Sequence, residues 1–204
     1  RLVTSRGAEN LYWLGRYTER AENTIALARL TLECLIGEDQ TCASLLAWLD
    51  QMARLNTLVL PDVPALTQSR RVFERSLIAS LGGEDLASSV GHSLRAVRNA
   101  GSAVRERLSY EHWNLIERVD SELVRAFASL SSPADFSTLD ALDLLKRLGR
   151  HMAAITGAQT DRKTRDDGWR LLSIGRHVER LGFLASSLSA GLETGSVCND
   201  AGFE

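Results

Sequence analysis

The feature that most limits how this chain can fold is a long helix-period pattern near its amino end. Between residues 8 and 36, apolar or small side chains recur at spacings of three and four: Leu11, Leu14, Thr18, Ala21, Ile25, Ala28 and Leu32. Residues with this spacing share one side of an α-helix, whereas a half-buried strand shows a period of two. The pattern therefore predicts one long amphipathic helix.

Helical patterning continues through the rest of the sequence. Six more segments show it: 41–58, 67–80, 85–108, 110–129, 138–156 and 168–192. Prolines and glycines separate several of them, and Ser109 and Asp166 are typical of residues that begin a helix. No segment shows the alternation of a strand. We therefore expect an all-α helical bundle of six or seven helices that forms a single domain over residues 1–204, with a flexible tail from about 193 to 204.

Composition and charge argue against several functional classes. A net charge of -2 gives no general attraction for nucleic acid or an anionic membrane, and no apolar run approaches the roughly 20 residues that span a bilayer. The cysteines are odd in number, and the four histidines lack the i,i+4 spacing of a metal site. We expect a cytoplasmic protein that binds no metal, no nucleic acid and no membrane.

A short element of the sequence occurs twice. Residues 11–20 align without gaps with residues 171–180, and their apolar positions fall in the same phase. Both copies contain the motif Gly-Arg-x-x-Glu-Arg, which comprises Gly15, Arg16, Glu19 and Arg20 in the first copy and Gly175, Arg176, Glu179 and Arg180 in the second. We interpret the two as quasi-equivalent helices that arose by duplication.

The charged residues of the motif share one side of their helix. Arg16, Glu19 and Arg20 are spaced by three and four residues, and Tyr12 and Trp13 lie on the same side. Because large aromatic side chains favour burial, we expect this face to pack, with its charges paired across helices and with the motif glycines allowing close approach.

Two interpretations of this face remain open from the residues alone. The favoured one is a salt-bridge network that only fixes how the helices meet. The other is an anion- or amine-binding site at the centre of the bundle. The candidate binding residues are the same in both: Arg16, Glu19, Arg20, Arg176, Glu179 and Arg180. No catalytic residue is assigned.

The same segments resemble a known family. Residues 8–23, Ala-Glu-Asn-Leu-Tyr-Trp-Leu-Gly-Arg-Tyr-Thr-Glu-Arg-Ala-Glu-Asn, resemble the opening of the bacterial Alpha-E domain family. Residues 94–109 with Trp113 resemble its middle motif, and residues 167–180 its later Glu-Arg motif. His177 stands where the family usually has Tyr, and Leu181-Gly182 where it has Ala-Glu or Ala-Asp. Family members usually continue beyond the position of Glu204, so we expect this chain to be part of a longer protein.

The resemblance implies a function. The family occurs beside, or fused to, circularly permuted ATP-grasp proteins and transglutaminase-like peptidases, which implies a role in making or modifying a peptide or amide bond. It implies that Glu19, Arg20, Glu179 and Arg180 are functional, with Arg16 and Arg176 beside them.

We therefore expect a helical accessory domain that is not catalytic on its own. It would act with an ATP-grasp ligase and bind the substrate or the catalytic partner through the Arg/Glu face. ATP and magnesium would belong to that partner, and the accessory domain would hold no cofactor. The alternatives are a structural or protein-interaction bundle, and a catalytic domain that uses Glu19 or Glu179 as acid or base. A homo-oligomer remains open.

Overall fold

The computed structural model describes residues 3–37, 42–82, 89–132, 135–160 and 165–198. These residues form seven α-helices and no strand, which confirms the predicted fold class. The helices are α1 (Ser5–Ile36), α2 (Ala43–Leu55), α3 (Arg70–Ser80), α4 (Val90–Ala103), α5 (Tyr110–Ala128), α6 (Thr138–Thr160) and α7 (Asp167–Glu193). Two single-turn 3-10 helices, η1 (Arg105–Arg107) and η3 (Ser196–Cys198), follow α4 and α7.

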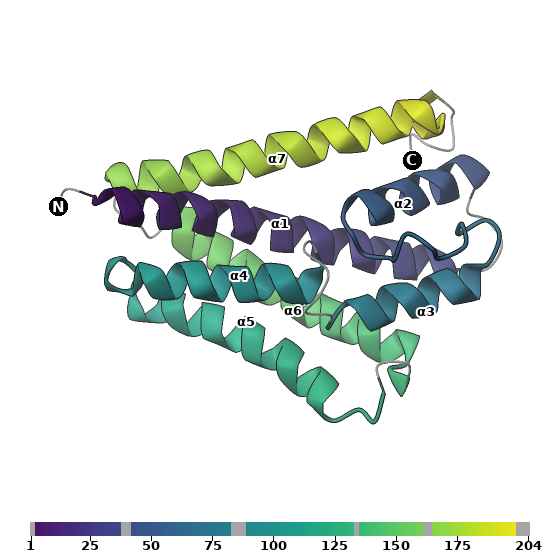
Figure 1. Cartoon of the computed structure of the whole chain (residues 1–204), viewed down its shortest axis with the longest axis horizontal. Helices are drawn as coiled ribbons and strands as arrows, with labels where there is room; N and C mark the ends of the chain where they lie inside the picture. Colours follow the sequence, from purple (N-terminus) through teal and green to yellow (C-terminus); the bar gives the residue numbers. More distant parts are fainter. Residues whose placement is uncertain (1–2, 38–41, 83–88, 133–134, 161–164, 199–204) are drawn as a thin grey trace.

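The long helix α1 is the centre of the arrangement. It packs against α7 on one side and against α4 and α6 on the other, while α5 packs on α4 and α6 (Figure 1). The helices α2 and α3 lie near the carboxyl end of α1. In Figure 1, α1 and α7 run side by side in the same direction, although the rest of the chain separates them in sequence.

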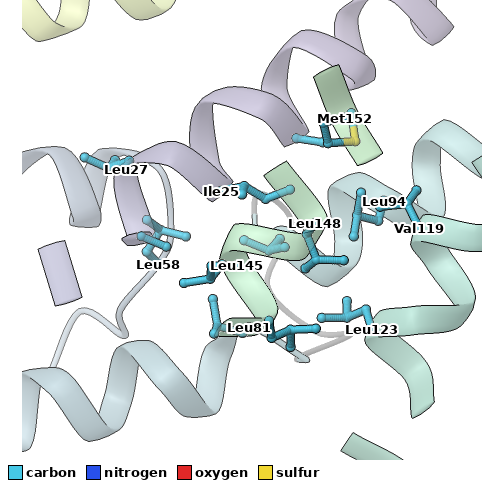
Figure 2. Packing of buried hydrophobic residues seen from close by; sticks show 14 of the residues in the cluster. Ile25, Leu27, Leu58, Leu81, Leu94, Val119, Leu123, Leu145, Leu148 and Met152 are labelled. Carbon is cyan, nitrogen blue, oxygen red and sulfur yellow. The ribbon is translucent and has the colours of Figure 1, made fainter. Parts of the chain in front are cut away.

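The predicted stripe of α1 forms part of the core. All of its members are buried: Leu11, Leu14, Thr18, Ala21, Ile25, Ala28 and Leu32. They meet apolar side chains from α4, α5 and α6, such as Leu94, Val119 and Leu148 (Figure 2). Burial of these side chains supplies most of the driving force for folding, at about 25 cal/mol per Å² of apolar surface.

Three helix boundaries differ from the sequence prediction. The second helix ends at Leu55 rather than near residue 58, because Thr57 adopts a left-handed backbone with a φ of 53°. The third begins at Arg70, because the Ser69 hydroxyl accepts a hydrogen bond from the Val72 amide and so caps the helix there. The helix predicted for 85–108 ends at Ala103 and is followed by η1; residues 85–88 lie outside the described part.

The first part of the predicted tail forms η3, which packs on α7. Ser196 is buried, and its hydroxyl donates a hydrogen bond of 3.3 Å to the carbonyl oxygen of Gly191. Residues 199–204 lie outside the described part. Among the helices that the structure describes, none is both long enough and apolar enough to cross a membrane.

Candidate functional site

The two copies of the motif meet where α1 and α7 touch through their backbones. A Cβ atom built on Gly15 would lie 2.0 Å from the carbonyl oxygen of Leu172, and one built on Gly175 would lie 2.1 Å from that of Tyr12. The contacts are reciprocal, since Tyr12 and Leu172 each precede the motif glycine of their own helix by three residues. Only glycine fits at these two positions, which confirms the predicted close approach.

The carboxylate of Glu19 is held by two arginines of the other helix. Arg180 donates from Nε to Oε1 over 2.7 Å and from Nη2 to Oε2 over 3.1 Å. Arg176 donates to Oε2 from Nε and Nη2, over 3.3 and 3.1 Å. Glu19 and Arg176 are 3% and 4% exposed, so this ion pair is internal.

The carboxylate of Glu179 is held in the corresponding way by α1. Arg16 donates from Nε over 2.6 Å, and Arg20 donates from Nε and Nη2 over 2.7 and 3.0 Å. Burial on its own would raise the pKa of Glu179, but the hydrogen bonds from Arg20 and Arg16 outweigh that effect and lower it. Glu179 is therefore ionised at neutral pH.

We call these six residues the Glu–Arg network. Each carboxylate belongs to one helix and both of its arginines to the other, so the predicted pairing across helices is confirmed. Four arginines and two glutamates give the network a formal charge of +2. Glu22 lies 3.6 Å from Arg176 and reduces this excess. Arg176 Nη1 is buried and has no hydrogen-bond partner among the described residues.

The two copies are equivalent in their pairing but not in their surroundings. Leu14 and Ala21 of α1 are fully buried, whereas the matching Ile174 and Leu181 of α7 are 53% and 70% exposed. The difference arises because α1 is covered on several sides, while α7 packs mainly on α1. Apolar residues at matching positions of the two copies are therefore not buried to the same extent.

Two aromatic rings of α1 lie beside the network. Trp13 and Tyr17 stack with ring centroids 5.5 Å apart, and we call this pair the aromatic shelf. The Arg16 guanidinium lies 5.4 Å from the Trp13 ring, and that of Arg20 lies 5.7 Å from the Tyr17 ring. Each arginine thus combines a carboxylate contact with a cation–π contact, which fixes its position.

The aromatic shelf lines a cavity with a volume of about 420 Å³. We call it the main cavity. It lies between α1 and α4 and is lined by Asn10, Trp13, Tyr17, His92, Arg95, Ala96, Asn99 and Ala100. Of these, sequence analysis singled out Trp13 as an aromatic residue of the charged face. It missed His92 and Asn99, although their spacing from Arg95 places all three on one side of α4.

Two nearby arginines, Arg98 and Arg105, do not line the main cavity. Arg98 pairs with Asp120 over 3.7 Å, and Arg105 lies over the Trp113 ring. A cavity of about 200 Å³ also borders the Glu–Arg network between the end of α2 and α7, and Arg16 and Glu179 line it. The ion pairs bring all six predicted binding residues together, and two of them, Arg16 and Glu179, line a cavity.

The remaining candidates have structural explanations. Asp166 caps α7, because its carboxylate accepts a hydrogen bond of 2.8 Å from the Trp169 amide, as predicted. His151 pairs with Glu122 over 2.6 Å. His112 is buried and lies 3.3 Å from the Gln159 amide. Within the described ranges, no three His, Cys, Asp or Glu residues are placed to hold a metal ion.

Fold and site together define a class of protein. Over residues 3–202 the chain matches Alpha-E, described as a predicted alpha-helical domain with a conserved ER motif. The match covers nearly the whole chain, and the chain belongs to this family. The Glu-Arg pairs at residues 19–20 and 179–180 are the parts of the network that fit that description.

Curated relatives share the sequence over most of its length. The uncharacterized protein Rv2567 of Mycobacterium tuberculosis and the uncharacterized protein Mb2597 of Mycobacterium bovis are each 25% identical to it over 205 residues. The alignments cover 93% of this chain but only 22% of each relative, so the chain spans about a fifth of their length. No solved structure shows significant similarity.

Proposed function

We propose that this chain is a helical accessory domain that acts with an ATP-grasp-type ligase in forming or modifying a peptide or amide bond. It binds the substrate or the partner on the surface where α1 and α7 meet. ATP and magnesium belong to the partner ligase, and the accessory domain supplies binding rather than chemistry. The resemblance to the Alpha-E family suggests the ligase.

The observation that carries the binding role is that the Glu–Arg network lines one cavity and contacts the aromatic shelf, which lines another. Its inner members, Glu19 and Arg176, are buried and hold the helices together. Its outer members reach the surface: Arg16 and Glu179 line the smaller cavity, and the Arg180 side chain is half exposed. A rigid helix pair with cavities at its edge is suited to hold a ligand in one orientation.

A catalytic role for the glutamates has less support. Both oxygens of Glu179 accept hydrogen bonds from arginines, and its pKa is lowered, so it is a weak base and is not protonated for use as an acid. Both oxygens of Glu19 are also occupied.

The structural alternative is supported by a specific observation. The arginines and glutamates of the network pair with each other between α1 and α7. A scaffold that only fixes the packing of the two helices would have the same pairing. The proposed role and this alternative differ in whether the outer members of the network contact another molecule.

Thermal melting with and without the ATP-grasp-type protein separates the two. The variants are Glu19→Gln, Glu179→Gln and Arg180→Gln, with Arg170→Gln as the control because Arg170 makes only an exposed pair with Asp167. We expect Glu19→Gln to lower the melting temperature strongly. Glu179→Gln and Arg180→Gln should lose less melting temperature than Glu19→Gln, and they should also lose the stabilisation that the partner gives.

The opposite pattern would contradict the binding role. If the partner stabilises Arg180→Gln and Glu179→Gln as much as wild type and Arg170→Gln, the outer members of the network make no contact with it. If both glutamate variants lose melting temperature equally and bind normally when folded, the scaffold alternative holds.

A further inference from the structure

The outer face of α7 carries a stripe of exposed apolar side chains. Its members recur at spacings that alternate between four and three residues, and all of them are exposed: Ile174, Val178, Leu181, Ala185, Leu188 and Leu192. We call them the α7 stripe. It extends over about five turns, or about 27 Å of helix. A continuous exposed apolar surface of this kind is typical of an interaction site.

A comparison with α6 shows that the stripe is not an ordinary solvent-facing surface. The exposed positions in the middle of α6 include Asp143, Lys146, Arg147 and Arg150. Between residues 174 and 192 of α7, Arg180 is the one exposed side chain with a permanent charge. The other sides of α7 pack on α1, α2 and η3, and the helix lies at the edge of the bundle (Figure 1). A face selected for contact with water would carry more charge.

The spacing of the stripe indicates that its partner is a helix. Alternating steps of four and three residues are the heptad spacing of a helix that packs lengthwise against another helix. An α-helix drifts by only about 20° per heptad relative to this spacing, so the whole stripe stays on one face. A small ligand would need a concave site, whereas the stripe is long and lies along a convex helix.

Two copies of α7 complement each other when they run antiparallel. With their crossing point at Phe183, the two stripes form layers of facing residues, in which each residue of one copy meets one of the other. The layers pair Leu181 with Ala185, Val178 with Leu188, and Ile174 with Leu192. The large Leu181 thus faces the small Ala185 twice at the centre, which allows the side chains to interdigitate. A two-fold axis closes this arrangement at two copies.

The charges of α7 do not oppose this pairing. The positions that flank the stripe, and that would face the flanks of a second copy, carry no permanent charge: Gly175, His177, Gly182, Leu184, Ser189 and Gly191. Like charges at such positions are a common device against self-association, and here they are missing. Arg180 lies outside these positions, and Glu19 binds its guanidinium.

We infer that the α7 stripe packs antiparallel against the α7 stripe of a second copy of this chain and so forms a symmetric homodimer. One pair of helices of this length makes a small interface, which is typical of weak association. At the low-micromolar concentrations of a melting experiment the chain is therefore monomeric. The inference does not depend on the proposed function, because the contact uses the outer face of α7 and not the Glu–Arg network.

Sedimentation equilibrium of this chain, between about 5 and 500 µM, tests the inference. We expect the average mass to rise with concentration from 22.4 kDa toward twice that value and to fit a monomer–dimer equilibrium without larger species. Leu181→Glu should weaken the dimer at least about tenfold, because it places two charges in the central layers. Leu139→Glu is the matched control, since Leu139 is 68% exposed on α6 and Leu181 is 70% exposed.

A swap of sizes tests the antiparallel register. Ala185→Leu alone should weaken the dimer, because it crowds the layer that it shares with Leu181. Leu181→Ala alone should weaken it by removing apolar contact. The double variant restores one large and one small residue per layer, and its affinity should return to within about threefold of wild type. Circular dichroism checks that each variant is folded.

Four results would overturn the inference. A mass that stays at that of the monomer up to 500 µM would exclude the dimer. Association of Leu181→Glu equal to that of wild type would place the contact elsewhere, and a stronger dimer in Ala185→Leu with no rescue by the swap would exclude the register. A monomeric chain whose stabilisation by the ATP-grasp-type protein is lost in Leu181→Glu would assign the α7 stripe to that protein instead.

Discussion

Each carboxylate of the Glu–Arg network is bound by two arginines, but the two carboxylates differ in how far they and their arginines are exposed to water. Glu19 is buried with Arg176, while Glu179 is bound to Arg16 and Arg20, whose side chains retain some exposure. A buried ion left without its counter-ion is costly, because it cannot regain the hydration it had in the unfolded chain. The same substitution should therefore have different consequences in the two halves.

The arginines Arg176 and Arg16 allow a direct comparison, since they occupy matching positions of the repeat. We expect Arg176→Gln to lower the free energy of unfolding by about 3–5 kcal/mol, the range for breaking a buried pair. Arg16→Gln should cost clearly less, because Arg16 is partly exposed and Arg20 still holds Glu179. Urea unfolding measures both, and equal losses would contradict the difference in burial.

Acid should destabilise the protein through its paired glutamates. The folded pKa of Glu179 lies below the ordinary 4.5, because the hydrogen bonds from Arg20 and Arg16 outweigh the effect of burial. The pKa of Glu122 is lowered as well: burial opposes this, and Arg147 and His151 outweigh it. A lowered folded pKa gives stability that is present above the unfolded pKa and is lost as the pH falls through the folded pKa.

We therefore expect the free energy of unfolding to decrease as the pH falls below about 4.5. In Glu179→Gln this decrease should be shallower, whereas an exposed control, Glu9→Gln, should follow wild type. Urea titrations at a series of pH values measure the slope. An unchanged slope in Glu179→Gln would show that its pairing contributes little.

At the scale of the element, the contact of α1 with α7 is set by two glycines. No side chain separates the helices at Gly15 and Gly175, so the backbones touch and the arginines reach the opposite carboxylate. A methyl group there meets a carbonyl oxygen that cannot rotate away. The helices must then separate, and the network loosens with them.

Gly15→Ala should therefore destabilise the protein by at least about 1–3 kcal/mol, the usual cost of overpacking. Gly182→Ala, on the same α7 helix, is the control, because a Cβ there meets nothing within 4 Å. That substitution should stabilise by up to about 1 kcal/mol through helix propensity. Thermal or urea unfolding measures the change in the free energy of unfolding for both variants. No change in Gly15→Ala would contradict the backbone contact.

The outer face of α7 is apolar but exposed. Leu181, Leu184, Leu188 and Leu192 are each more than half exposed. Leu181→Glu should change the free energy of unfolding by no more than about 0.5 kcal/mol, as for other surface substitutions. Ala21 occupies the matching position of the first copy of the repeat, and it is buried. Ala21→Glu should therefore unfold the protein, because it places a charge in the core. Circular dichroism melting distinguishes the two, and strong destabilisation by Leu181→Glu would mean that this face is covered.

At the scale of the whole molecule, the two motif copies meet only because the intervening helices fold back. The helices α4 and α6 pack against α1, α5 packs on α4 and α6, and α7 then returns along α1 (Figure 1). α2 is also tied to α7, since Trp48 Nε1 donates a hydrogen bond of 2.9 Å to the carbonyl oxygen of Ser187. Folding of α1 is thus coupled to the last helix.

A chain ending at residue 165 should lose cooperative unfolding. It would expose Leu11 and leave Glu19 without either arginine. Adding a synthetic peptide of residues 166–193 should restore a cooperative melting transition, because the network forms between rather than within helices. Calorimetry with and without the peptide measures this. A sharp transition of the truncated chain alone would show that α7 is an independent addition.

Much of this fold could be predicted from the chain, because its long periodic segments are determined by local sequence. The stripe of α1, the caps Ser109 and Asp166, and the role of Gly15 all follow from spacing and side-chain type. The prediction of helix ends was less accurate where a single residue determines the end. Thr57 does so for α2 through its left-handed backbone.

The site was harder to predict than the fold. The spacing of Glu19 indicated that it shares a face with its own arginines, but not that Arg176 and Arg180 bind it. The main cavity depends on how α4 packs against Trp13, which is a tertiary contact with no local signal. The exposure of Ile174 and Leu181 likewise depends on what covers α7, which periodicity does not report.

The reciprocal contacts of α1 and α7 have a consequence for the origin of the chain. An approximate two-fold axis runs between the helices, so each half supplies the counter-ions of the other. An ancestor that carried a single copy of the motif would have had a carboxylate without its clamp, and self-association of two such molecules would have completed both at once. Fusion of two such molecules would give one polypeptide with this reciprocal pairing, and its halves would then be free to diverge, one into the interior and the other toward the solvent.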